Sequence, residues 1–175
     1  MAGSDARPRA LRVARDLSLK DGFTATGEVR LPYAWIEGHL DLSGAKLLNR
    51  QPDTLHADGC RVDGDVRLRY EFEATHRVSL VGMRIKGSLD ADQAVFRLPG
   101  QTVWDLSGAS IGGDWSFRET VVDGGIMAHG ASIGGDLDGD RSRLSQPDGE
   151  ALRGYALETG GDLRFVGASI VGDVL

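Results

Sequence analysis

Short stretches in which apolar and polar residues alternate run along nearly the whole chain. Representative apolar pairs, each separated by one residue, are Leu40 and Leu42, Val66 and Leu68, Trp104 and Leu106, and Leu163 and Phe165. Alternation with a period of two is typical of β-strands that bury one face. A second short stretch of the form Ala-x-Ile follows, for example at Ala109 to Ile111. The pattern therefore predicts many short strands and no helix.

The strands recur with a fixed short period. The segment GASIGGD occupies Gly108–Asp114 and appears again at Gly130–Asp136. A weaker copy, VVDGGI, lies halfway between them at Val121–Ile126. The underlying unit is therefore about 11 residues long, and self-similarity at such a short period indicates a solenoid. One unit is too short for a strand, a crossover helix and a parallel strand.

Two units together, about 22 residues, can close one coil of a single-stranded parallel β-helix, and the chain then holds roughly seven coils. The predicted fold is all-β, a β-solenoid, with right-handed winding expected from the general preference of parallel crossovers. Alternate units supply two inner walls. The first wall consists of Val13, Ile36, Val62, Ile85, Ile111, Ile133 and Thr159. The second consists of Ala25, Leu47, Ala74, Phe96, Val122, Leu144 and Ile170.

The solenoid pattern covers residues 13–175, and residues 1–12 form a short basic polar tail that leads into the first coil. A chain of 175 residues fits one domain. Both ends of the pattern stop without capping repeats, and exposed strand edges tend to pair. We expect either that the chain is a piece of a longer array or that its ends associate with one another.

Three longer spacings, each of about 15 residues, interrupt the short period. They follow Leu47, Phe96 and Leu144 of the second wall, and each insertion contains a proline. The pattern predicts three loops in a row along one edge, two coils apart. Insertions of this kind are often where solenoids bind partners, or they are only tolerated at a corner. The candidate contact residues on this edge are Arg50, Asp53, Arg97, Gln101, Asp148 and Glu150.

Trp35 is a further candidate contact residue, together with Tyr33. It lies between the inward residues Ala34 and Ile36 and should point outward, and exposed tryptophans are frequent in binding hot spots. Trp104 and Trp115, in contrast, are expected to fill the core or cap it. The single cysteine, Cys60, occupies a slot held by alanine in other units, which predicts a buried, inert thiol.

The charge balance is acidic but uneven. Lys and Arg number 20 and Asp and Glu number 26, a net charge of −6. Residues 1–20 contain five basic and two acidic residues, a net of +3, which leaves −9 for the remainder. Direct nucleic-acid binding, which needs clustered cations, is therefore not expected. No apolar run approaches the ~20 residues of a membrane span, and the first ten residues lack a secretory core, so we expect a cytoplasmic protein that does not enter a membrane.

The sequence predicts no catalytic, cofactor or metal site. Metal-ligand spacing is absent around the four histidines, which are His39, His56, His76 and His129. Polysaccharide-cleaving β-helices use clustered carboxylates with Arg or Lys, and the densest such group here is Asp138, Asp140 and Arg141. Charged residues at a corner are usually only solvated, so an enzyme is the less favoured alternative.

Aspartates recur at the turn that follows the first wall. Asp16, Asp65, Asp114 and Asp162 occupy equivalent positions that repeat about every 49 residues. Asp136 and Asp173 should occupy the same position in other coils. We expect each carboxylate to accept a hydrogen bond within its own turn. A column of carboxylates could also bind a cation or imitate phosphates.

The motifs GASIGGD, LDLSGAKL and GGDLRFVGASI resemble those of the pentapeptide-repeat-like proteins, a bacterial superfamily of right-handed β-helices. The resemblance covers residues 13–175. Its standard pattern has one inward residue in every five, whereas the inward spacing here alternates between 5 and 6 over Leu106, Ile111, Phe117 and Val122. This difference corresponds to a divergent branch with larger coils. The best-understood activity in the superfamily is protection of DNA gyrase by an acidic rod that resembles B-DNA.

From these patterns we expect a non-enzymatic scaffold that binds a protein partner, with the edge of the three insertions as its binding face. One alternative is an acidic rod that imitates DNA and binds a type II topoisomerase. Another is a self-assembling structural element similar to the bactofilins, which would associate end to end.

Overall fold

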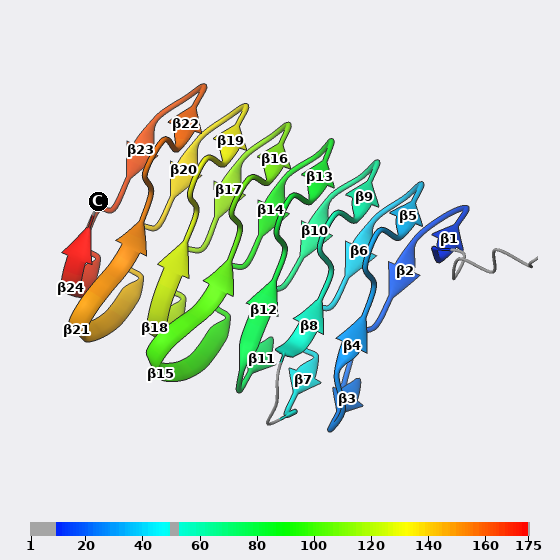
Figure 1. Ribbon diagram of the computed structural model, residues 1–175, viewed down its shortest axis with the longest axis horizontal. Helices are drawn as coiled ribbons and strands as arrows, with labels where there is room; N and C mark the ends of the chain where they lie inside the picture. The colour runs from blue at the N-terminus through cyan, green and yellow to red at the C-terminus, as the bar shows by residue number, and fades with distance from the viewer. Residues whose placement is uncertain (1–9, 50–52, 175) are drawn as a thin grey trace, which may run out of the picture.

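The computed structural model describes residues 10–49 and 53–174, and their regular structure is entirely β-strand. The strands follow one another around a stack of coils, which rises from one end of the molecule to the other (Figure 1). Two of the sheets that run along the stack contain seven strands each, one from every coil. The predicted all-β parallel solenoid of about seven coils is thus confirmed. Among the described residues, no helix has the length and apolar character needed to cross a membrane.

Three sheets run along the stack. The first contains β1 (Arg12–Val13), β5 (Trp35–Ile36), β9 (Arg61–Val62), β13 (Arg84–Ile85), β16 (Ser110–Ile111), β19 (Ser132–Ile133) and β22 (Glu158–Thr159). The second contains β2 (Leu17–Ser18), β6 (Leu40–Asp41), β10 (Val66–Arg67), β14 (Leu89–Asp90), β17 (Trp115–Ser116), β20 (Leu137–Asp138) and β23 (Leu163–Arg164).

The third sheet follows the remaining sides of the coils. Its main path contains β3 (Thr24–Ala25), β7 (Lys46–Leu47), β11 (Glu73–Ala74), β15 (Val95–Asp105), β18 (Val121–Met127), β21 (Arg143–Arg153) and β24 (Ser169–Val174). A second path contains β4 (Val29–Arg30), β8 (Asp53–His56) and β12 (Arg77–Ser79), and β12 pairs with the far end of β15.

The coils alternate in length. Residues in register along the first sheet are 23, 26, 23, 26, 22 and 26 positions apart, in the order Arg12, Trp35, Arg61, Arg84, Ser110, Ser132 and Glu158. The shorter coils agree with the predicted two-unit coil, and the longer ones carry the insertions. These longer coils are the ones in which the sequence places the three insertions, so the predicted order of plain and extended coils is confirmed.

Both predicted inner walls are confirmed by the strand registers. The first wall runs up the first sheet, where Ile36 pairs with Val62, and the second runs up the third sheet, where Leu47 pairs with Ala74. These four side chains are fully buried. Each short strand points only one or two side chains inward, so the core is a narrow column that runs through the stack. Every coil contributes to this core and none contains all of it.

Aromatic rings fill the middle of the shaft. The ring of Trp104 stacks on Phe96, with centroids 4.6 Å apart, and meets Trp115 edge-on at 5.4 Å. Both tryptophans are completely buried, as the sequence predicts. Cys60 is also buried, as the sequence predicts, and the loss of solvent around its thiol raises the pKa to about 12, which disfavours the reactive thiolate.

The recurring aspartates join each coil to the next. The backbone N–H of Asp136 donates to Asp114 Oδ1 at 2.9 Å, and the N–H of Asp162 donates to Asp136 Oδ1 at 2.8 Å. Earlier coils repeat this contact, with His39 Nδ1 and Ser88 Oγ as acceptors in place of a carboxylate. The expectation that each carboxylate bonds its own turn is corrected, because the side chain reaches the equivalent turn one coil further on. Asp173 does not share this slot, since it lies in β24 and pairs with Glu150.

The second and third insertions continue as strands. They form the long, curved strands β15 and β21, and β18 lies between them and pairs with both (Figure 1). Gly124 of β18 allows this approach, since a Cβ there would meet the carbonyl oxygens of Leu98 and Gln101 at 2.7 and 2.9 Å. Part of the first insertion, including Arg50 and Pro52, lies outside the described residues.

Candidate anion-binding site

The outward face of the first sheet brings together cations from successive coils. Parallel pairing places residues in register directly above one another, so that Arg61 and Arg84 lie above Trp35. Lys86 follows Arg84 two positions later on the same face. In the next two coils the equivalent positions hold small residues, namely Ser110 and Gly112 and then Ser132 and Gly134, before Glu158 follows in the last coil.

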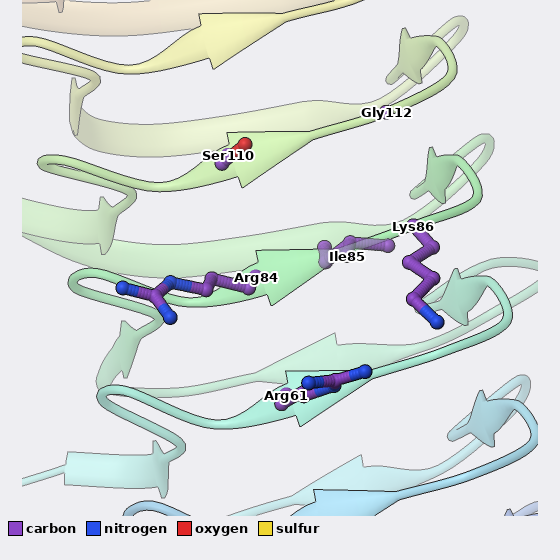
Figure 2. Close-up of a pocket in the computed structure, with 6 residues that line it drawn as sticks. All are labelled: Arg61, Arg84, Ile85, Lys86, Ser110 and Gly112. Atoms are coloured by element: carbon purple, nitrogen blue, oxygen red, sulfur yellow. The ribbon is translucent and has the colours of Figure 1, made fainter.

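These residues surround a shallow cleft of about 600 Å³, lined by Arg61, Arg84, Ile85, Lys86, Ser110 and Gly112. Figure 2 shows the side chains of Arg61, Arg84 and Lys86 on two neighbouring coils, while the coil above them offers only the short side chain of Ser110 and the bare backbone of Gly112. The cleft is open because large cationic side chains stand beside a coil that has no bulky residues at these positions. It can therefore receive a group from outside without a change of backbone.

Asp63 positions two of the three cations. Its Oδ1 accepts a hydrogen bond from Arg61 Nε at 2.9 Å and lies 3.1 Å from Lys86 Nζ, and its Oδ2 accepts one from the Trp35 indole at 3.2 Å. The bond from Arg61 makes the largest contribution to lowering the pKa of Asp63 to about 2, with further contributions from Lys86 and Trp35. Asp63 is therefore ionised at neutral pH and partly neutralises the cleft.

Arg84 is the cation of the cleft that has no counter-ion in the part of the chain that the structure describes. Its side chain is exposed, and no residue in the described ranges forms a hydrogen bond or an ion pair with its guanidinium group. Arginine presents five N–H donors in a planar arrangement that matches carboxylate and phosphate oxygens. The cleft thus offers an unused set of charged donors.

Trp35, the candidate contact residue of the sequence analysis, points outward but is covered. The guanidinium carbons of Arg12 and Arg61 lie 4.2 and 5.0 Å from its ring centroid, on the coils below and above. The indole is half-buried as a result. Tyr33 is well exposed and has a positive φ of 56°. The structure therefore makes Trp35 a support for the cationic side chains more than a free surface.

No family model, curated protein or solved structure matches the chain. The parallel solenoid rests on the structure itself, and the resemblance to the pentapeptide-repeat-like proteins stays a prediction.

The candidate residues of the insertions are distributed over different environments. Gln101 and Glu150 line one cleft of about 250 Å³ between β15, β18 and β21, where Glu150 forms an ion pair with Arg153. Arg97 is exposed and pairs with Glu73 at 2.7 Å, and Asp148 is exposed. Asp53 is buried, in contrast to its predicted place on a binding edge, because it lies in register with Arg77, whose guanidinium group bonds its carboxylate at 2.7 Å. Arg50 lies outside the described residues.

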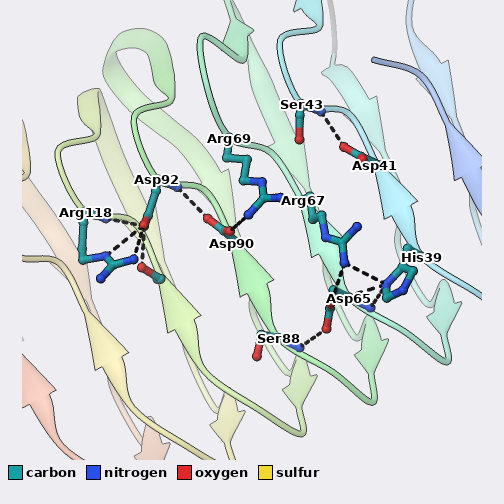
Figure 3. A network of polar contacts seen from close by, with 11 residues as sticks. His39, Asp41, Ser43, Asp65, Arg67, Arg69, Ser88, Asp90, Asp92 and Arg118 are labelled. Atoms are coloured by element: carbon teal, nitrogen blue, oxygen red, sulfur yellow. Dashed lines mark hydrogen bonds and ion pairs between the residues drawn. The ribbon is translucent and has the colours of Figure 1, made fainter. Parts of the chain in front are cut away.

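The outer face of the second sheet carries a network of paired charges (Figure 3). Arg69 binds Asp90 at 2.8 Å, and Arg118 Nε binds Asp92 at 2.9 Å. The acidic group singled out in the sequence is likewise divided: Asp140 pairs with Arg164 at 3.2 Å, while Arg141 pairs with Glu119 at 2.7 Å. These side chains connect coils and do not converge on one point.

Sequence reasoning missed Arg61, Arg84 and Lys86. Arg61 and Arg84 come directly before the wall residues Val62 and Ile85, and Lys86 directly follows Ile85, so all three occupy outward positions. The predicted walls could therefore have placed them on one face. The signal is weak, because charged residues at outward positions are also expected on any solvated strand.

Proposed function

We propose that the protein is a non-enzymatic binding scaffold and that the cleft on the first sheet binds an acidic segment of a protein partner. The observation that carries this proposal is the exposed guanidinium group of Arg84, which has no partner among the described residues and lies beside Lys86 in an open cleft. A carboxylate placed there would form charge-assisted hydrogen bonds.

The surface next to the cleft favours an extended chain as the ligand. Two outward columns continue along the stack with small residues, one with Ser110 and Ser132 and the other with Gly112 and Gly134. This strip has no bulky side chains to obstruct a peptide whose acidic group binds Arg84. A long nucleic acid is less suitable, because Asp63 already neutralises much of the charge on Arg61 and Lys86, and the whole chain is acidic.

The test is a titration of a fluorescein-labelled oligoglutamate peptide, followed by fluorescence anisotropy at low ionic strength. We expect Arg84→Ala to weaken binding about three- to tenfold, the range of a lost exposed charge pair or charge-assisted bond. Asp63→Asn should strengthen binding, because it removes the anion that competes for Arg61 and Lys86. Both effects should shrink as salt is added.

Arg143→Ala is the matched control, since Arg143 is exposed on β21 of a different sheet and has no ion pair within the described ranges. Equal loss of affinity in the Arg84 and Arg143 variants would show that only overall charge matters. Such a result, or an unchanged affinity in Arg84→Ala, would refute the proposed site.

The two structural alternatives differ in what supports them. A rod that imitates DNA needs free carboxylates along one face, and the described carboxylates of the second sheet, such as Asp90, Asp92 and Asp140, have arginine partners. We therefore favour the scaffold, and a supercoiling assay in which the protein inhibits gyrase would favour the DNA mimic instead. Self-association depends on the two ends of the stack.

A further inference from the structure

Three side chains that can bind a metal ion meet where β4 and β8 pair, on the third sheet and not on the first sheet, which carries the cationic cleft. Glu28 precedes β4, and Asp53 and His56 are the first and last residues of β8. One ligand atom of each lies within 4.8 Å of the other two. His56 Nδ1 is 3.4 Å from Glu28 Oε1 and 3.8 Å from Asp53 Oδ2. Coil stacking produces this group from residues that are far apart in the sequence.

The three groups are close without being hydrogen-bonded to one another. Glu28 Oε1 is buried and has no hydrogen-bond partner among the described residues, and the Glu28 side chain is only 12% exposed. A separation of 3.4 Å from an imidazole nitrogen to a carboxylate oxygen is long for a charge-assisted hydrogen bond, which is usually below about 3 Å. A buried carboxylate oxygen without a donor requires an explanation, and a role in binding an ion is one of the standard ones.

Arginines hold both carboxylates in place by their other oxygens. Arg30 Nη1 donates to Glu28 Oε2 at 2.8 Å, and Arg77 Nε donates to Asp53 Oδ1 at 2.7 Å. A longer contact of 3.3 Å joins Arg77 Nη2 to Asp53 Oδ2, and that oxygen still has a second lone pair. The Asp53 side chain is 4% exposed, so its orientation is determined by packing and by Arg77.

We propose that Glu28 Oε1, Asp53 Oδ2 and His56 Nδ1 bind a divalent transition-metal ion of the Zn²⁺ type. Ligands about 2.0–2.1 Å from a tetrahedral centre are about 3.3–3.4 Å apart, and the two separations measured from His56 Nδ1 are 3.4 and 3.8 Å. One imidazole and two carboxylates suit Zn²⁺ better than Mg²⁺ or Ca²⁺, which prefer oxygen ligands alone. The fourth position is left for water.

The surroundings of His56 support this assignment. Asp58 Oδ2 lies 3.5 Å from Nε2, the ring nitrogen that faces away from the other two ligands. A carboxylate beside the second nitrogen of a metal-binding histidine favours the tautomer whose Nδ1 is free to bind the ion. Arg30 and Arg77 balance the charges of Glu28 and Asp53, and the carboxylate of Asp58, on the other side of the imidazole ring, offsets part of the charge of the added ion. The site is structural, since it ties the first coil to the second.

The experiment is equilibrium dialysis of the whole chain, freed of metal with a chelator, against ZnCl₂ alone, with zinc measured by elemental analysis. We expect one Zn²⁺ per chain. Glu28→Gln and His56→Asn should each weaken binding at least tenfold. Bound Co²⁺ in place of zinc should give the strong visible absorption of a tetrahedral site.

His129→Asn is the control, because His129 is an exposed histidine whose ring stacks on Tyr155 at 5.1 Å, away from carboxylates of this group. It should retain full binding. Circular dichroism of each variant checks that the coils are folded, and Glu28→Gln tests the site even if His56→Asn does not fold. Less than one tenth of an equivalent of zinc in the unmodified chain, or equal affinity in Glu28→Gln and His129→Asn, would overturn the proposal and leave the group as a set of ion pairs.

Discussion

Each Gly-Gly-Asp turn uses its three residues for different contacts with the neighbouring coil. In Gly130–Asp136, a Cβ on Gly134 would overlap the carbonyl oxygen of Gly112, and a Cβ on Gly135 would overlap the carboxylate of Asp114. Asp136 donates its N–H to that same carboxylate and offers its own to the next coil. The motif therefore encodes the stacking of coils. A cation is not needed to explain it, because the carboxylates already accept backbone hydrogen bonds.

The stacking role predicts that Gly134→Ala is strongly destabilising. The added methyl group collides with backbone at the centre of the stack, which cannot move without disturbing two coils, so the free energy of unfolding should fall by about 1–3 kcal/mol. The measurement is urea denaturation followed by circular dichroism. Gly27→Ala is the control, since nothing lies within 4 Å of a Cβ there and its φ is not in the left-handed region. Equal stability of the two variants would contradict the stacking role.

The recurrence of these aspartates could be predicted from the sequence, but their partners could not. The repeated GASIGGD segment places Asp114 and Asp136 at the same corner. Whether a carboxylate bonds its own turn or the turn above depends on the direction of one side chain, which a period does not determine. The same limit applies to Glu28 and His56, since their contact depends on the longer step between two particular coils.

At the scale of strands, the inner walls follow from the alternating pattern and the insertions do not. A period of two identifies the inward residues because each must be apolar. The insertions contain proline and glycine, so the sequence predicts loops, yet β15 and β21 continue as strands because β18 offers both a backbone to pair with. The tertiary contact, which the sequence does not display, decides the outcome.

The aromatic rings packed around Trp104 predict that replacing Trp104 lowers the free energy of unfolding much more than replacing Trp35. Trp104→Ala removes a completely buried side chain that contacts Phe96 and Trp115, and should cost about 3–5 kcal/mol. Trp35→Ala removes a half-buried ring that contacts two arginines, and should cost about 1 kcal/mol. Urea denaturation of both variants gives the comparison. Similar costs would mean that the shaft collapses around the missing ring.

At the scale of the whole molecule, the exposed ends of the stack raise the question of whether two copies can associate end to end. The last coil exposes apolar side chains, with Leu163 61% and Val166 67% exposed, and the carboxylate of Asp162 is in the place where inner coils accept a hydrogen bond from the next turn. A second copy stacked in the same register would place Arg15 above Asp162. The six later coils have glycine at the position of Arg15, namely Gly38, Gly64, Gly87, Gly113, Gly135 and Gly161.

The Arg15 position predicts that end-to-end assembly in the internal register is blocked. A Cβ at the equivalent Gly135 overlaps the carboxylate below it, so the Cβ of Arg15 would overlap Asp162 of a second copy in the same way. Sedimentation velocity over a wide concentration range should show one species that does not grow. Arg15→Gly should allow larger species at high concentration, and Arg15→Lys, which keeps the Cβ, should not. A ladder of species in the unmodified chain would mean that the ends join in a different register, and would favour the self-assembling element over the scaffold.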